Sequence, residues 1–301
     1  MMDLICAGEA MAELRRDGAA YRIGFAGDTF NTAVYAMRNL GPSAQVGFLT
    51  RMGNDPMSDE LAKLAAKEKV ALPGCTRDPE RSLGLYAVTT DATGERSFHY
   101  WRENSAARRL FCDPMELQIL TQAKVAYLSG ITLAILSPTA REALYDALET
   151  FRSNGGLVAF DSNYRPRLWE DKITAQSHIS HMWQMVDIAL PSVDDEMDLF
   201  DDPDVQTVLT RLRDWGCHKG ALKRGPEGPA PLAPDFPSTL SFPCATNVVD
   251  TTAAGDSFNG GYLAGVLRGV SETECLKLAH ATALTVIAQP GAIVPQRQET
   301  A

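Results

Sequence analysis

Small residues and one carboxylate stand together near the C-terminus, in the order Asp-Thr-Thr-Ala-Ala-Gly-Asp-Ser-Phe over residues 250–258. The valines at 248–249 predict a strand before this stretch, and apolar and small residues at 260–267 predict a buried helix after it. The amides of residues 253–256 then lie at a helix N-terminus without intrahelical partners, so they can bind an anion such as phosphate. In the same turn, the Asp256 carboxylate stays ionised and can accept a proton from a hydroxyl. Taken alone, the stretch fits an ordinary capped helix equally well.

A second polar group occurs where a glycine turn at 24–27 leads into a helix predicted to begin near Asp28. Asp28 and Asn31 are three residues apart and share one helical face. Their carboxylate and amide can therefore bind neighbouring hydroxyls of a ligand. The alternative is a glycine turn followed by an Asp N-cap. We favour hydroxyl binding.

Two runs with period-2 alternation, 83–90 and 95–102, flank a four-residue Asp/Gly turn and predict an antiparallel hairpin. Tyr100 and Arg102 share one face of their strand. They can be simply an exposed ring and a solvated charge. Alternatively, the Arg102 guanidinium gives a two-pronged contact to a carboxylate, a group that neutral sugars lack. Arg165, just past a predicted strand end, offers a second cation.

Two further turns follow predicted strands. The turn that contains Lys223, Gly225 and Gly228 is rich in Gly and Pro and fits a simple hairpin connection. The run Ser-Val-Asp-Asp-Glu at 192–196 fits ordinary complementation of a helix dipole.

The chain contains neither Gly-x-Gly nor Gly-x-x-x-x-Gly-Lys-Ser/Thr, which excludes the dinucleotide fingerprint and the Walker-type phosphate loop as local motifs.

The composition limits the partners. With 28 Lys and Arg against 38 Asp and Glu, the formal net charge is −10, which argues against a nucleic acid or an anionic membrane as partner. No run of 18 uninterrupted apolar residues occurs and the N-terminus lacks a basic start, so we expect a cytoplasmic protein. The six cysteines show no Cys-x-x-Cys spacing and are expected to be reduced. His178 and His181 have no third metal ligand nearby, so we expect a solvated helix face there.

A regular alternation of strands and helices must position these groups. Buried strands are predicted at 3–8, 44–49, 124–128, 156–160, 186–190 and 219–223, and amphipathic helices near 28–40, 57–68, 138–153, 204–214 and 271–288. This predicts an α/β fold with a mostly parallel sheet between two helical layers, and ligands at the carboxyl ends of its strands. The hairpin does not belong in such a sheet. We expect one domain, 1–301, with a small β-sheet lid formed by about 11–25 and 75–104.

The stretch at 250–258 closely resembles a signature of the ribokinase-like (PfkB) carbohydrate kinases, and Gly27-Asp28 with Asn31 resembles the family's other signature. The resemblance extends from Gly8 to the segment 290–295. It implies a three-layer α/β/α fold with a lid that covers the sugar and often joins two subunits. Ala253 stands where the family usually has Gly, and so does Ala26. If position 253 needs a positive φ, its alanine is strained.

The resemblance also implies roles for individual residues. Asp256 is implied as the catalytic base, beside an anion hole formed by the amides of Ala253, Ala254, Gly255 and Asp256. The sugar is expected to contact Gly27, Asp28, Asn31, Tyr86, Tyr100, Arg102 and Arg165, and ATP to contact Asn163, Lys223, Gly225 and Gly228. Asp195 or Glu196 is expected to organise magnesium, mainly through water.

Residues 94–102 and 161–166 are very similar to the corresponding stretches of the 2-keto-3-deoxygluconate kinases within this family. That likeness implies ATP-dependent phosphorylation of 2-keto-3-deoxygluconate at its 6-hydroxyl, with a homodimer formed through the lid, or a higher homo-oligomer. Two alternatives stay open. One is a kinase for another sugar, such as 2-keto-3-deoxygalactonate, fructose or a nucleoside. The other is a sugar-acid sensor without turnover, against which the intact Asp256 and Gly255 argue.

Overall fold

A five-stranded parallel sheet forms the centre of the computed structural model, which describes residues 1–18, 20–90, 96–236 and 240–296. The strand order is β11-β10-β9-β1-β4, with bounds Ile188–Ala189, Leu157–Asp161, Ala123–Ser129, Met2–Ala7 and Val46–Leu49. Every neighbouring pair is parallel. Strands buried on both faces are apolar almost throughout, which explains the continuous apolar runs in the sequence. The predicted α/β fold is confirmed.

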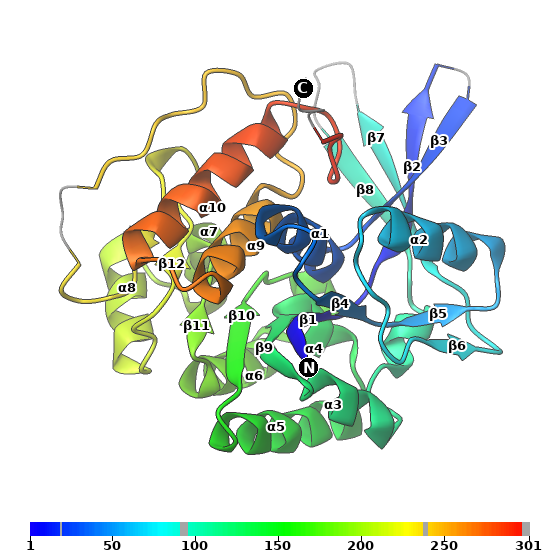
Figure 1. The fold of residues 1–301 in the computed structure, drawn as a ribbon, viewed down its shortest axis with the longest axis horizontal. Helices are drawn as coiled ribbons and strands as arrows, with labels where there is room; N and C mark the ends of the chain where they lie inside the picture. The colour runs from blue at the N-terminus through cyan, green and yellow to red at the C-terminus, as the bar shows by residue number, and fades with distance from the viewer. Residues whose placement is uncertain (19, 91–95, 237–239, 297–301) are drawn as a thin grey trace.

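Alternate residues of β1 belong to two hydrophobic cores, one on each face of the sheet. Leu4 and Cys6 share a core with four helices: α1 (Asp28–Leu40), α2 (Pro56–Lys67), α9 (Ala254–Leu267) and α10 (Glu272–Ile287). Ile5 and Ala7 share the other core with α3 (Pro114–Leu120), α4 (Gly130–Ile135), α5 (Pro138–Ser153), α6 (Lys172–Met185), α7 (Val193–Phe200) and α8 (Val205–Asp214). In Figure 1, α1, α9 and α10 lie above the sheet, and α3, α5 and α6 lie below it.

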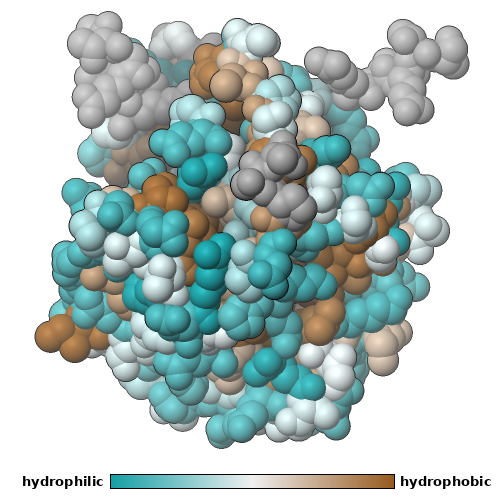
Figure 2. Space-filling view, turned by 90° about the vertical axis from the view of Figure 1, so that its left-hand side faces the viewer, coloured by the Kyte–Doolittle hydropathy of each residue, from teal (hydrophilic) through white to brown (hydrophobic). Residues whose placement is uncertain are grey.

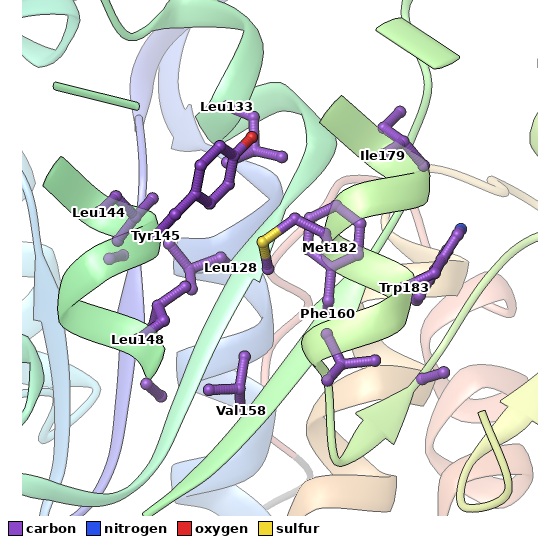
Figure 3. Close-up of a cluster of buried hydrophobic side chains, with 14 of the residues drawn as sticks. Leu128, Leu133, Leu144, Tyr145, Leu148, Val158, Phe160, Ile179, Met182 and Trp183 are labelled. Carbon is purple, nitrogen blue, oxygen red and sulfur yellow. The ribbon is translucent and has the colours of Figure 1, made fainter. Parts of the chain in front are cut away.

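The lower core holds β9 and β10 in place against α5 and α6 (Figure 3). Leu128 and Phe160 extend from the two strands toward Leu148 of α5 and Met182 of α6, and all four side chains are fully buried. Phe160 also meets Trp183 edge to face, with ring centroids 4.9 Å apart. Such dense packing gives a rigid base to the strands, whose carboxyl ends carry the polar residues described below.

Four strands form a second sheet that projects from one edge of the core (Figure 1). Its order is β3-β2-β7-β8, with bounds Ala20–Ala26, Met11–Asp17, Gly84–Thr90 and Arg96–Trp101. The predicted hairpin forms as β7 and β8, and its turn at 91–94 lies outside the described residues. Residues 11–26 contribute two antiparallel strands, and β2 also pairs in parallel with β7. We call these four strands the lid sheet.

Three details differ from the sequence expectations. The strand predicted at 248–249 is wrong: both valines are exposed, and the Val249 amide donates to the Ile287 carbonyl at the end of α10. The strand predicted at 219–223 shortens to β12 (Ala221–Leu222), which pairs antiparallel with β13 (Ala230–Pro231). His181 is exposed and His178 is half-buried, and both rings contact Tyr145, so the predicted solvated face is right for His181 and only partly right for His178.

Short elements complete the described chain. β5 (Arg51–Gly53) pairs in parallel with β6 (Thr76–Asp78), and 3-10 turns occur at Ala106–Arg109, Pro166–Leu168 and Gly225–Glu227. No helix in the part of the chain that the structure describes is long and apolar enough to cross a membrane. On the face shown in Figure 2, hydrophilic residues predominate and hydrophobic residues form separate small areas.

Candidate active site

The turn before α9 has the backbone shape expected of an anion cradle. Ala253 is the N-cap residue and adopts the left-handed conformation, with φ 59° and ψ 18°. The Ala254 amide donates to the Thr251 carbonyl at 3.1 Å, whereas the Gly255 and Asp256 amides have no hydrogen-bond partner among the described residues. The left-handed conformation costs an alanine about 1–2 kcal/mol relative to its usual backbone conformations. Ala253 is therefore strained in its backbone conformation, as expected where an alanine stands in place of glycine.

Asn31 joins the two signatures, although they are more than 200 residues apart in the chain. Its side-chain amide donates to Asp256 Oδ2 at 2.8 Å, and its Oδ1 accepts a long contact from the Gly27 amide at 3.5 Å. The Thr32 hydroxyl lies 3.2 Å from the Asp256 carbonyl and so holds the same turn. Helices α1 and α9 pack directly against each other, which places their N-termini side by side. The structure thus brings Gly27, Asn31 and Asp256 together.

Burial and the nearby Asp28 carboxylate together raise the pKa of Asp256 to about 7, against the lowering effect of the Asn31 hydrogen bond. Asp28 is itself buried and accepts a hydrogen bond from Asn163 at 2.8 Å. Asn163 follows β10 and has a φ of +32°, a region that Asn tolerates better than most residues. Two carboxylates and two amides therefore converge where α1, α9 and the end of β10 meet. A carboxylate with a pKa near neutrality suits general-base catalysis.

Lys223 lies beside the cradle within a buried polar network. Its ammonium donates to Asp161, the last residue of β10, and to Asn259 at 3.1 Å. Asn259, one turn after Asp256 on α9, donates to Asp161 at 2.7 Å and to the Tyr127 hydroxyl at 2.9 Å. A Cβ added to Gly255 would lie 3.6 Å from Lys223 Nζ, so the ammonium faces the cradle. This network fixes a positive charge next to the amides of the turn.

The turn after Lys223 carries two glycines with positive φ, 54° at Gly225 and 74° at Gly228. The Arg224 guanidinium closes this turn through the Gly228 carbonyl at 3.1 Å. A Cβ at Gly225 would meet open space, whereas one at Gly228 would approach the Phe242 side chain at 3.1–3.4 Å. The two glycines and the Arg224 contact therefore form a compact turn after Lys223.

On the lid sheet, Tyr86, Tyr100 and Arg102 form one continuous group. The two tyrosine rings stack at 5.7 Å between centroids, and Arg102 Cζ lies 5.9 Å from the Tyr100 centroid. Tyr86 is buried and donates to Glu13, whereas Tyr100 is 45% exposed. Burial raises the pKa of Tyr86 far above its usual value, so its hydroxyl stays a donor. One face of the lid sheet thus offers aromatic rings, a hydroxyl and a guanidinium.

The two arginines expected at a carboxylate belong to separate ion pairs. Arg102 is buried and paired with Glu9, which is the second residue after the end of β1. Arg165 is half exposed, donates to the Tyr164 carbonyl at 2.7 Å and pairs with Asp195 at 3.0 Å. Neither guanidinium is therefore a free cation in the absence of ligand.

The two acidic residues considered for magnesium differ sharply. Glu196 is fully buried, and its two oxygens accept hydrogen bonds from Trp183 at 3.2 Å and Arg211 at 3.0 Å. Asp195 is only partly buried, and desolvation raises its pKa to about 6. Within the described residues, no three His, Cys, Asp or Glu side chains are arranged to hold a metal ion. Mg²⁺ often binds through one or two carboxylates, waters and substrate phosphates; the Asp195 carboxylate is partly accessible for such contacts, whereas both oxygens of Glu196 already accept hydrogen bonds.

Sequence reasoning missed three contributors to this region: Glu9, Asp161 and Asn259. Asp161 had a visible signal, since it is the polar end of an apolar strand. Asn259 lies three residues after Asp256 and shares its helical face. Glu9 had no comparable signal, because its partner Arg102 is 93 residues away.

Comparisons with known proteins agree with this geometry. The model of the pfkB family of carbohydrate kinases matches residues 1–299. The chain is 41% identical over 298 residues to the 2-dehydro-3-deoxygluconokinase of Escherichia coli K12, with 96% of each chain covered, and 42% identical over 296 residues to that of Dickeya dadantii, with 96% and 95% covered. A candidate ribokinase II of E. coli, solved with ATP and Mg²⁺, superimposes with a TM-score of 0.83 at 22% identity, over 97% of this chain and 94% of that one. The chain belongs to the pfkB family of carbohydrate kinases.

Proposed function

We propose that this protein phosphorylates 2-keto-3-deoxygluconate, also called 2-dehydro-3-deoxygluconate, at its 6-hydroxyl with ATP as donor. The products are 2-keto-3-deoxy-6-phosphogluconate and ADP. The observation that carries this proposal is the contact of Asn31 with Asp256 at the mouth of the amide cradle, which puts a base beside an anion site. The choice of sugar acid rests on the names of the relatives at 41–42% identity over nearly the whole chain.

Asp256 is the proposed base. It takes the proton of the 6-hydroxyl while the hydroxyl oxygen forms a bond to the γ-phosphorus and the bond from that phosphorus to the β-bridging oxygen breaks, which releases ADP. Asn31 holds the carboxylate through Oδ2, which leaves Oδ1 to take the proton of the acceptor hydroxyl. A pKa of about 7 leaves a substantial ionised fraction at neutral pH and a driving force for proton transfer.

The amides of Ala253, Ala254, Gly255 and Asp256 are proposed to stabilise charge on the transferring phosphoryl group, together with the Lys223 ammonium next to Gly255. For the Ala254 amide, this requires release of its contact with Thr251. Magnesium, if bound through Asp195 and water, would neutralise further charge on the phosphates. We assign Asn163, Gly225 and Gly228 to the ATP side of the site; Asn163 also holds Asp28 through its side-chain amide.

Sugar contacts are proposed on two surfaces, the N-terminus of α1 and the lid sheet. Gly27, Asp28 and Asn31 hold hydroxyls near the reacting end, and Tyr86, Tyr100 and Arg102 of the lid sheet hold the opposite end, with Arg102 at the carboxylate. We retain Arg165 as a second carboxylate contact, which requires it to leave or share its ion pair with Asp195.

The six cysteines, all free, support a reducing compartment, and we propose the cytoplasm.

The outer face of the lid sheet supports a proposed homodimer. Residues of this face alternate with the site-facing ones, and its cross-strand rows are Phe25-Ala12-Leu85-Trp101 and Ile23-Leu14-Ala87-His99. Ile23 and Trp101 are 49% and 57% exposed. A small sheet seldom exposes such an apolar face, so we propose that the lid of a second copy covers it.

Product analysis tests the proposed reaction. The protein is incubated with ATP, magnesium and 2-keto-3-deoxygluconate, and the product is examined by mass spectrometry and phosphorus NMR. We expect the sugar acid to gain one phosphoryl group whose phosphorus couples to the protons at C6, in equal amount to ADP. If ADP forms only at the rate of ATP hydrolysis without sugar, the proposed function is wrong.

A further inference from the structure

Glu9 lies at the junction between the core sheet and the lid sheet. It is 2% exposed and lies between the end of β1 and the start of β2. A Cβ on Gly27 would lie 2.1 Å from the Glu9 carbonyl oxygen, and a Cβ on Gly84 would lie 2.8 Å from Glu9 Oε1. Glu9 therefore packs between the N-terminus of α1, which carries Asp28, and the first residue of β7. Both are neighbours of the proposed sugar site.

The Glu9–Arg102 ion pair is buried but incomplete. Arg102 Nη2 donates to Glu9 Oε2, and the two side chains are 8% and 1% exposed. Arg102 Nε and Glu9 Oε1 are buried without hydrogen-bond partners among the described residues. A buried pair adds stability only if its remaining donors and acceptors are also satisfied. A single contact that leaves Arg102 Nε and Glu9 Oε1 without partners contributes little to stability. It does hold one end of the guanidinium, and it leaves the other N–H groups for a ligand.

We propose that Glu9 is the positioning residue for Arg102, and that it sets the direction in which the guanidinium meets the substrate carboxylate. The inference rests on the proposed function, in which Arg102 binds that carboxylate. Arg102 contacts Glu9 through Nη2, and its Cζ lies over the Tyr100 ring at 5.9 Å from the centroid, so two neighbours define its orientation. Because Glu9 holds one end of the guanidinium, the remaining N–H groups meet the substrate carboxylate in one orientation. Glu9 acts only through Arg102 and does not touch the reacting atoms.

The substitution Glu9→Asp tests this idea, because it keeps the charge and withdraws the carboxylate by one methylene. We expect the KM for 2-keto-3-deoxygluconate to rise about 10-fold, since small misplacements of a binding group are costly. The kcat at saturating sugar and the KM for ATP should stay within about twofold. In a background of Arg102→Leu, the added Glu9→Asp should change the sugar KM by less than about twofold. Glu9 acts on the sugar only through Arg102, and the effects of substitutions at two contacting residues are not additive.

A matched control comes from another buried ion pair, that of Arg51 with Glu116, which joins β5 to α3 at 2.6 Å. Glu116→Asp makes the same chemical change outside the proposed sugar site, so it should lower the melting temperature and leave the sugar KM unchanged. If Glu9→Asp also changes only stability, or if its effect on the sugar KM persists in full in the Arg102→Leu background, the positioning role is wrong. Wild-type turnover of the sugar acid in the same assay tests the proposed function separately. If Glu9→Asp fails to fold, Glu9→Gln replaces it. A full wild-type sugar KM in Glu9→Gln means that a neutral acceptor is sufficient to position Arg102. An equal rise in the sugar KM with and without Arg102 overturns the inference.

Discussion

The Asn31 side-chain amide donates a hydrogen bond to the Asp256 carboxylate at 2.8 Å, from the first turn of α1 to the first turn of α9. This contact places one group proposed to bind sugar hydroxyls directly on the proposed catalytic base. It also leaves the second carboxylate oxygen without a side-chain partner among the described residues. In the proposed mechanism the same pair of helices would position the acceptor hydroxyl and the base, so the packing of α1 against α9 would set the geometry of proton transfer.

Asp256→Asn should lower kcat by about 10²–10⁴, because the amide cannot accept the hydroxyl proton in the transition state. The amide oxygen can still accept the hydrogen bond from Asn31, so the fold and the affinities for ATP and sugar should be retained. Steady-state kinetics and isothermal titration calorimetry measure the two effects separately. Turnover close to that of the wild type would exclude Asp256 as the base.

The raised pKa of Asp256 predicts the acid limb of the pH profile. The base must be ionised, and burial together with Asp28 raises its pKa to about 7, so kcat/KM should increase with pH up to about 7 and level off above it. Below that pH, kcat/KM should fall about tenfold per pH unit. The residual activity of Asp256→Asn should lack this limb. A wild-type profile that stays flat down to about pH 5 would show that Asp256 is not the base, or that its pKa is not raised.

Ala253→Gly should stabilise the protein, because glycine adopts a φ of 59° without the steric cost that alanine pays there. The expected gain is about 1 kcal/mol, or about 2–4 °C in melting temperature for a chain of this size. Ala254→Gly is the matched control, since the next residue is the first of α9 and gains nothing from a left-handed conformation. It should destabilise the protein by about 0.5–1 kcal/mol. Equal effects of the two substitutions would mean that residue 253 is not strained.

The regular framework was predictable because its signals are local. The apolar runs at 124–128 and 156–160 and the periodic stretch at 28–40 became β9, β10 and α1 almost residue for residue. The valines at 248–249 have strong β propensity, but the Ile287 carbonyl at the end of α10 provides the partner for the Val249 amide, and no strand forms. Tertiary contact overrode propensity there.

The candidate site was predictable only where a single stretch carried its chemistry. Asp256 and Asn31 belong to recognisable stretches, and the structure joins them. The ion pairs of Arg102 with Glu9 and of Arg165 with Asp195 depend on which segments meet in space, which a single sequence does not state. Both arginines were expected at one carboxylate, and that expectation took no account of their acidic partners. A buried charge needs a partner, so an acidic residue near Arg102 is a physical requirement, whereas the half-exposed Arg165 carries no such requirement.

Ile23→Lys should convert the proposed dimer to a monomer, because a charge on the outer face of the lid sheet cannot be buried against a second copy without a partner. Ile23 is 49% exposed in the single chain. The control is Ile173→Lys in the first turn of α6, where the side chain is 77% exposed and lies outside the lid sheet. Light scattering at micromolar concentration gives the mass of each protein. A wild-type monomer under these conditions would contradict the dimer.

The central claim is that this kinase acts on a sugar acid, and its most direct test is the ratio of two kcat/KM values. One substrate is 2-keto-3-deoxygluconate, and the other is the neutral analogue that carries a hydroxymethyl group in place of the carboxylate. A charge-assisted contact with Arg102 contributes about 1.5–3 kcal/mol, so the acid should be preferred by about 10- to 150-fold. In Arg102→Leu the preference should nearly vanish, through loss of activity on the acid. Equal kcat/KM values for the acid and the analogue in the wild type would contradict the claim.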